Sequence, residues 1–261
     1  MDDAAAAGAV RPPRPDFSFA AWAPHGYTAE SLSKIVRRTP EISKIYLRAD
    51  QEFERKPGAG EGVAFARYFE CLHDPLHGGP WLDPRDPGVR RAVAARAAEE
   101  AKKSTEIHLD YVRCGTSPDP ETREAVTLLV GEIAEAVRAA APGTTLSAAV
   151  FPTPESALEH NQDWMRWVRE GLVDYVCPML YENDSAGFRA SLRACLDAAP
   201  AEKLVPGIGN GADGAQTGAA AFREETAAAA AAGCRGAAFF PLDESLPPLF
   251  AAAKDAPRGG N

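Results

Sequence analysis

Short apolar segments alternate with longer amphipathic segments along the chain. The apolar segments have the length and patterning of β-strands, whereas the amphipathic ones repeat their apolar positions at helical spacing. The expected strands cover residues 17–23, 42–49, 62–72, 107–113, 145–151, 173–181, 203–211 and 236–242. This alternation predicts a parallel sheet, because a parallel strand returns only through a crossover connection.

Start and stop signals support the helices expected between these strands. Thr28 offers an N-cap, Pro87 stands near a helix entrance, and Gly171 and Gly233 stand where helical patterns end. The expected helices cover residues 31–38, 83–103, 117–140, 154–171, 185–199 and 215–232, and a broken closing helix covers 245–254.

Eight strand–helix units predict one α/β domain, a (β/α)₈ TIM barrel over residues 16–255. The length of 261 residues is within the usual range for this fold. Residues 1–15 and 256–261 are expected to be a flexible arm and tail. An open doubly wound sheet is the alternative, although no GxGxxG motif follows the first strand.

The connection between the second and third strands does not fit a regular barrel. Residues 50–61 are too few for a normal crossover helix. We therefore expect a shortened or open wall between these two strands. Alternatively, residues 62–72 are themselves the helix and the third strand is missing, because their apolar and aromatic composition allows either structure.

The balance of charges limits the partners of this protein. A formal net charge of −9 argues against binding to nucleic acid or to an anionic membrane surface. No segment approaches the roughly 20 apolar residues of a membrane span, and the N-terminus lacks the pattern of a signal peptide. As written, the chain is expected to be cytoplasmic, with localisation left open. The sequence does not indicate an oligomeric state.

No cofactor and no metal are expected. The five cysteines are an odd number and no two have CxxC spacing, which argues against a disulfide framework or a zinc site. No GxSxG motif indicates a serine nucleophile.

The segment TEIHLDYVRCG, residues 105–115, carries polar side chains in an expected buried strand. Side chains on a strand point alternately to its two faces. One face is expected to point into the barrel and carries His108, Asp110 and Val112. The other is expected to meet the helices and carries Ile107, Leu109 and Tyr111. Burying a lone carboxylate costs several kcal/mol, so Asp110 needs a partner or a catalytic purpose. Asp110 also lies near the C-terminal end of its strand, where barrel enzymes place catalytic groups. A structural Asp–Arg pair is the alternative.

Polar and aromatic residues end other strands as well. A ring of carboxylate, amide, Arg and Tyr side chains around a barrel mouth suits the hydroxyl groups of a sugar. The candidate substrate-binding residues are Trp22 as a stacking face, Arg48, Asp50, Tyr181, Asn210 and Asp243, and His108 as a hydrogen-bond partner of Asp110.

Several segments, taken in order, resemble the glycosyl-hydrolase-like family 10, a group of predicted glycoside hydrolases with TIM-barrel domains. They are WLDPRDPGVRR (81–91), IHLDYVR (107–113), LSAAVFPTP (146–154), QDWMRWVREGLVDYVCPMLY (162–181) and GAAFFPLDE (236–244). The resemblance implies that Asp110 is catalytic and that Arg48, Arg113 and Tyr181 belong to the same site. Members of that family are commonly exported.

The sequence therefore predicts a glycoside hydrolase with a carbohydrate substrate. Such chemistry generally needs two carboxyl groups, and we assign them to Asp110 and Glu182, with Asp50, Asp243 and Glu244 as competitors for the second role. A barrel that binds glycans without cleaving them is the alternative. A metal-dependent hydrolase is a third possibility, but His108 and Asp110 alone are too few ligands.

Overall fold

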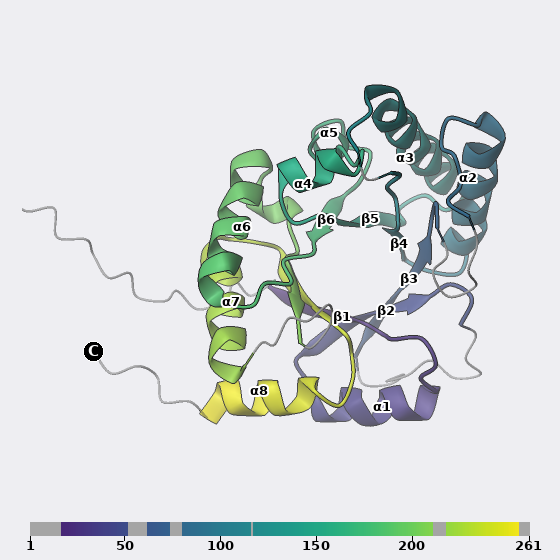
Figure 1. The fold of residues 1–261 in the computed structure, drawn as a ribbon. Coiled ribbons are helices and arrows are strands. Elements are labelled where there is room, and N and C mark those ends of the chain that lie inside the picture. The colour runs from purple at the N-terminus through teal and green to yellow at the C-terminus, as the bar shows by residue number, and fades with distance from the viewer. Residues whose placement is uncertain (1–16, 52–61, 74–79, 116, 211–217, 256–261) are drawn as a thin grey trace, which may run out of the picture.

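The computed structural model describes residues 17–51, 62–73, 80–115, 117–210 and 218–255, so the expected arm and tail lie outside the described residues. It confirms the predicted TIM barrel: eight parallel strands form a ring inside a layer of helices (Figure 1). The strands are β1 (Ser18–Trp22), β2 (Ile42–Arg48), β3 (Ala64–Glu70), β4 (Glu106–Asp110), β5 (Thr145–Val150), β6 (Tyr175–Pro178), β7 (Gly207–Gly209) and β8 (Gly236–Phe240).

The strands follow one another around the ring in chain order. Neighbours pair from β1 to β6, and β1 also pairs with β8, which pairs with β7. Two bridges, Val176 to Leu204 and Met179 to Gly207, join the remaining edges. Gly207 permits this approach, because a Cβ there would lie 3.1 Å from the Pro178 carbonyl oxygen. The joined edges exclude the open doubly wound alternative.

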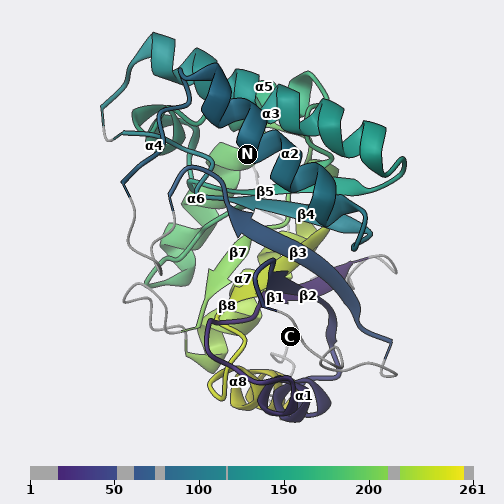
Figure 2. The same cartoon turned by 90° about the vertical axis from the view of Figure 1, so that its right-hand side faces the viewer.

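Helices cover the outside of the ring. They are α1 (Ala29–Arg38), α2 (Pro87–Ala101), α3 (Pro120–Ala140), α4 (Pro154–Glu159), α5 (Trp164–Arg169), α6 (Ser185–Ala198), α7 (Ala219–Ala231) and α8 (Leu246–Asp255), with a 3₁₀ turn η1 (Ala201–Lys203). The side chains of Thr28, Asp86, Asp119 and Asp184 cap their helices by accepting backbone N–H groups. Figure 2 shows α2 beside α3, and α1 beside α8. Within the described ranges, no helix has the length and apolar character needed to span a membrane.

The wall between β2 and β3 is a continuous sheet, which excludes an open wall, and the described residues give it no covering helix, as a shortened wall predicts. The third strand is present, and it pairs with β2 from Lys44–Ala64 to Arg48–Tyr68. The sheet is therefore continuous here, and the reading of residues 62–72 as a helix was wrong. Residues 52–61 lie outside the described part, and the described residues place no helix between these two strands.

Two helix expectations also need correction. The predicted helix over 154–171 is divided into α4 and α5, because the backbone leaves the helix at His160 and Asn161 has a left-handed φ of 58°. The predicted break near the C-terminus is absent, since α8 is continuous. Its two prolines follow Leu246 directly and stand in the first turn, where a missing N–H breaks no helical hydrogen bond.

The barrel wall separates two apolar clusters. Outward side chains such as Ile45, Phe69 and Leu109 pack with the helices in the larger cluster. Inward side chains, among them Tyr46 and Tyr68, form the smaller cluster inside the ring. The alternation of faces along each strand thus produces one core outside the ring and one within it.

A buried carboxylate organises the N-terminal end of the ring interior. Glu106 at the start of β4 pairs with Lys44 on β2, with 2.5 Å between Nζ and Oε2. The other oxygen, Oε1, accepts the hydroxyl groups of Ser147, at 2.8 Å, and Tyr175. Glu106 is 5% exposed, so these partners replace the water that it loses on folding.

The hydrogen bonds to Glu106 determine which atoms of Ser147 and His108 carry protons. Ser147 donates to Glu106, so its oxygen must accept from His108 Nδ1 at 2.8 Å, which leaves His108 Nε2 as an acceptor. Burial, and secondarily the charge of Lys44, lowers the pKa of His108 to about 3, so the ring is neutral. His108 therefore belongs to the polar interior of the barrel.

We predict that Glu106→Leu destabilises the fold by about 3–5 kcal/mol, because it leaves Lys44 and two hydroxyl groups without their acceptor. Urea unfolding followed by circular dichroism measures this loss as a lower midpoint. Glu99→Leu, which breaks the exposed pair of Glu99 with Lys102, is the control and should leave the midpoint unchanged. A Glu106→Leu protein as stable as the wild type would contradict the prediction.

Candidate active site

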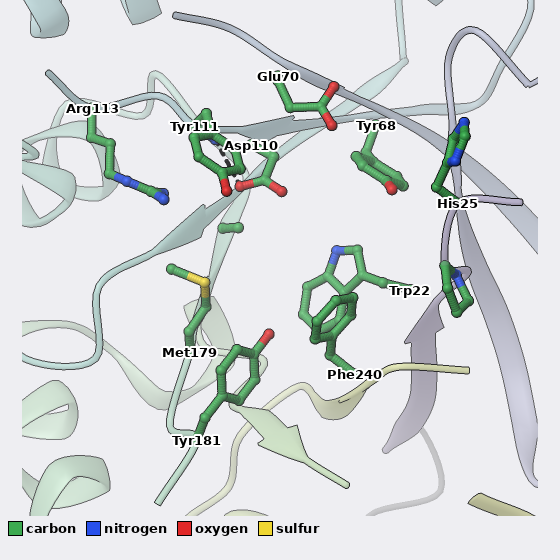
Figure 3. Close-up of a pocket in the computed structure, with 12 residues that line it drawn as sticks. Trp22, His25, Tyr68, Glu70, Asp110, Tyr111, Arg113, Met179, Tyr181 and Phe240 are labelled. Atoms are coloured by element: carbon green, nitrogen blue, oxygen red, sulfur yellow. Dashed lines mark hydrogen bonds between the residues drawn. The ribbon is translucent and has the colours of Figure 1, made fainter. Parts of the chain in front are cut away.

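A cavity of about 340 Å³ opens at the C-terminal mouth of the barrel (Figure 3). The loops and strand ends that line it come from β1, β3, β4, β5, β6 and β8. The lining residues are Trp22, Pro24, His25, Tyr68, Glu70, Asp110, Tyr111, Arg113, Ala149, Met179, Tyr181 and Phe240. A mouth built from strand ends is the position at which barrel enzymes carry their active sites.

Two carboxyl groups lie next to each other in this cavity. Glu70 ends β3, Asp110 ends β4, and the two are register partners in the parallel ladder. Adjacent strands are about 4.8 Å apart, so the two side chains leave the backbone close together on the inner face. Figure 3 shows them on one rim, opposite Tyr181 and Phe240.

The two carboxyl groups have different surroundings. Burial raises the pKa of Asp110, and the charge of Arg113, the Tyr111 backbone N–H and Arg48 offset part of this rise. Glu70 instead accepts a hydrogen bond from Arg48 Nη1 at 2.9 Å in a buried ion pair. Asp110 thus binds a proton more readily than a free aspartate does, whereas Glu70 is paired with Arg48 as a carboxylate, and such a division suits acid–base chemistry.

The backbone turns abruptly after Asp110. Tyr111 has a φ of 46°, a left-handed conformation that is uncommon for a residue with a side chain. Its N–H donates to Asp110 Oδ1 at 2.7 Å. The turn ends the strand alternation, so Tyr111 lines the cavity and Val112 packs in the outer core. The predicted faces of these two residues were therefore wrong, because the alternation was continued past Asp110.

Arg113 is placed beside Asp110 by aromatic neighbours. Its guanidinium lies 4.2 Å from the ring centroid of Tyr111 and 5.0 Å from that of Phe151. Its Nη1 atom is buried, and in the described part of the chain it has no hydrogen-bond partner. Arg113 therefore keeps a donor that a ligand in the cavity can use.

Two amide side chains hold the loops behind this rim. Gln162 accepts the Phe151 N–H at 2.7 Å and donates to the carbonyl groups of Val112 and Ala149, each at 3.3 Å. Asn161 donates to the Cys114 carbonyl group at 2.8 Å. Both amides lie just before α5, so the break between α4 and α5 ties together the ends of β4 and β5.

Four of the predicted site residues line the cavity: Trp22, Asp110, Arg113 and Tyr181. His108 does not line it. Its ring is fully buried against Tyr46, at 4.4 Å between centroids, and against Trp22 at 5.6 Å. His108 supports the aromatic floor of the cavity. Its Nδ1 is engaged by Ser147, and within the described residues no hydrogen bond joins its ring to Asp110.

The remaining predicted residues lie around the cavity without lining it. Arg48 is buried behind Glu70 and also pairs with Asp50 at 2.8 Å. Glu182 accepts a hydrogen bond from Ser191 on α6 at 2.6 Å. Asn210 and Asp243 both bind the Ser245 hydroxyl and so brace the loop after β8.

Sequence reasoning missed several lining residues, chiefly Glu70 and Tyr68 on β3. Their signal was the alternation of Ala66, Tyr68 and Glu70 on one face, which is informative only once residues 62–72 are taken as a strand. His25, Met179 and Phe240 also line the cavity, and their sequence context carries no comparable signal.

No protein-family model matches the chain, and no curated protein matches it either. The resemblance to glycosyl-hydrolase-like family 10 therefore stays a prediction.

Solved structures do match the fold. The spore cortex-lytic enzyme SleL of Bacillus megaterium QM B1551 has a TM-score of 0.67 at 13% identity, over 93% of this chain and 75% of that one. A chitinase from Chromobacterium violaceum has a TM-score of 0.67 at 12% sequence identity, over 92% of this chain and 99% of the chitinase. An endo-beta-1,4-mannanase from Thermotoga petrophila has a TM-score of 0.62 at 11% sequence identity, over 86% of this chain and 67% of the mannanase. The chain shares the barrel fold of these three enzymes.

Metal ligands are a separate question for this site. Among the residues that the structure describes, no three His, Cys, Asp or Glu side chains gather closely enough to hold a metal ion.

We predict that Gln162→Leu destabilises the protein by about 2–4 kcal/mol, because three backbone groups lose their buried partner. Gln162→Glu keeps the acceptor for the Phe151 N–H but places a buried carboxyl group against the carbonyl oxygens of Val112 and Ala149, so its effect should be at least as large. Chemical unfolding of the two variants and the wild type measures their relative stabilities. Equal stability of Gln162→Leu and the wild type would contradict the role assigned to this side chain.

Proposed function

We propose that this protein is a glycoside hydrolase that acts on an oligosaccharide or polysaccharide, with Asp110 and Glu70 as its carboxyl pair. The observation that carries the proposal is the register pairing of these two residues at the barrel mouth, inside one cavity. Glu70 takes the role that the sequence assigned to Glu182, whose carboxylate instead binds Ser191. The structural neighbours named above, a chitinase and a mannanase among them, support a glycan as the substrate class.

The different surroundings of the two groups assign their roles. Asp110, with its raised pKa, donates a proton to the glycosidic oxygen as the bond to the anomeric carbon breaks. Glu70, held as a carboxylate by Arg48, attacks the anomeric carbon and forms a glycosyl ester. Water then cleaves this ester, Asp110 takes up the proton of the water, and Glu70 is released as a carboxylate.

Side chains of the cavity wall suit a sugar ring. Trp22, Tyr68, Tyr181 and Phe240 offer aromatic faces for the C–H groups of a pyranose, and Arg113 offers a free donor for a ring substituent. This combination of flat apolar surface with a few directed polar groups is what a carbohydrate needs.

A glycan-binding barrel without catalysis is the second candidate function. The ion pair between Arg48 and Glu70 favours it, because a carboxylate engaged by a guanidinium is a weaker nucleophile. Turnover separates the two functions, since the binding protein would retain glycans without releasing reducing ends.

We predict that Asp110→Asn and Glu70→Gln each lower kcat by about 10²–10⁴-fold, because each removes a group that acts in the transition state. The measurement is the release of reducing ends from chitin, mannan and other polysaccharides and of phenol from aryl glycosides. Glu182→Gln is the matched control and should keep wild-type activity. Wild-type rates in Asp110→Asn would refute the assignment.

The pH dependence of an Arg113 variant tests whether Asp110 is the general acid. This charge lowers the pKa of Asp110, so Arg113→Gln should raise it further. A general acid works only while protonated, and the alkaline limb of kcat/KM should therefore move to higher pH in Arg113→Gln. Arg189→Gln, a change on the exposed side of α6, should leave the limb in place. A shift to lower pH in Arg113→Gln would show that Asp110 does not control this limb.

A further inference from the structure

A second cavity adjoins the candidate active site. It also has a volume of about 340 Å³, and it is lined by residues of β3, α2 and the segments between them, among them Phe69, Glu70, His73, Leu82 and Arg96. Glu70 lines both cavities. The second cavity therefore lies next to the carboxyl pair, between β3 and α2.

An aromatic cluster, Tyr111, His73 and Trp81, spans the two cavities. Tyr111 lines the first cavity, and His73 lines the second. The rings of His73 and Trp81 stack at 4.4 Å with an angle of 11° between them. Tyr111 lies 5.6 Å from His73 and 6.0 Å from Trp81, measured between ring centroids. The cluster thus extends the aromatic wall of the active site outward.

The exposure of Trp81 is not explained by packing of the fold. Its side chain is 45% exposed, and the neighbouring Leu82 is 41% exposed. The other two tryptophans outside the first cavity, Trp164 and Trp167, are fully buried. An indole left this open beside a ligand cavity offers its surface to a binding partner.

Polar groups of the second cavity complete the features of a sugar site. The Arg96 guanidinium lies 4.8 Å from the Phe69 ring centroid and borders the cavity. The Nδ1 atom of His73 is buried and has no hydrogen-bond partner in the part of the chain that the structure describes. A sugar ring presents apolar C–H faces and hydroxyl edges, and this site offers a counterpart for each.

We propose that the second cavity and the Tyr111–His73–Trp81 cluster form an additional subsite, which binds sugar units of the chain whose bond is cut at Asp110 and Glu70. This inference rests on the proposed function. It specifies the substrate as a glycan chain that extends beyond the cleavage point across Trp81, so a hexasaccharide binds better than a disaccharide.

Binding measurements with defined sugars test this subsite without requiring turnover. The probes are the hexasaccharides of chitin, β-1,4-mannan and cellulose and the matching disaccharides, titrated calorimetrically into the wild-type chain and into Asp110→Asn. Trp81→Ala should weaken binding of the preferred hexasaccharide about three- to tenfold and leave the disaccharide unchanged, since one aromatic contact is lost. Trp81→Phe, which keeps a stacking face, should recover part of the affinity.

Leu128→Ala is the matched control, because Leu128 is a comparably exposed apolar residue at 46% and lies on α3. It should bind every probe as the wild type does, and thermal unfolding should show that all variants remain folded. Equal hexasaccharide affinity in Trp81→Ala and the wild type would overturn the subsite, as would a failure of the wild type to bind any hexasaccharide. Binding that depends on Trp81 without any release of reducing ends would leave the subsite in place and refute hydrolysis.

Discussion

A charge enclosed by eight strands must be paired or must lie where solvent enters, and this constraint shapes the interior of the barrel. The inward side chains of β2 and β4 show the result. Lys44 and Glu106 pair at one end of the ring, and Arg48 and Asp110 stand at the mouth. Between these layers, Tyr46 and His108 pack ring against ring. The burial cost of each charge is met at an end of the barrel, where partners or water are within reach.

The uncharged layer of Tyr46 and His108 separates the network around Glu106 from Asp110 at the mouth. His108 is neutral and its Nδ1 proton is committed to Ser147, so the network around Glu106 ends at an aromatic floor beneath Trp22. The acid at the mouth is therefore tuned by its own neighbours. Burial raises the pKa of Asp110, and Arg113 is the leading charge that opposes this rise. The lower network stabilises the barrel, and the upper layer lines the cavity at the mouth.

The sequence predicted the features that follow from regular periodicity. Alternation along β4 correctly placed Asp110 at the mouth, and strand–helix alternation correctly predicted the ring. It missed Glu70, because the aromatic segment around it satisfies both a strand and a helix pattern. The φ of Tyr111 was also beyond prediction, since a left-handed tyrosine depends on tertiary contacts that over-determine the backbone. Irregular positions of this kind supply much of the candidate site.

The position of Glu182 shows how one turn changes the character of the mouth. The backbone N–H groups of Leu180 and Glu182 donate to carbonyl groups two residues earlier, so the chain turns tightly after β6. Tyr181 enters the cavity, and Glu182 reaches α6 instead. The rim opposite Asp110 and Glu70 is consequently formed by Met179, Tyr181 and Phe240 (Figure 3).

One rim is therefore acidic and the other apolar, so a sugar in the proposed reaction has the carboxyl pair on one side and an aromatic surface on the other. In the proposed reaction, a pyranose ring stacked on Tyr181 and Phe240 turns its other face toward the opposite rim, where the carboxyl groups of Asp110 and Glu70 lie. A mouth with acidic groups on both sides would lose this apolar surface and hold the ring less firmly. The pairing of both acids on adjacent strands thus leaves the facing wall to the aromatic contacts that position the substrate in the proposed reaction.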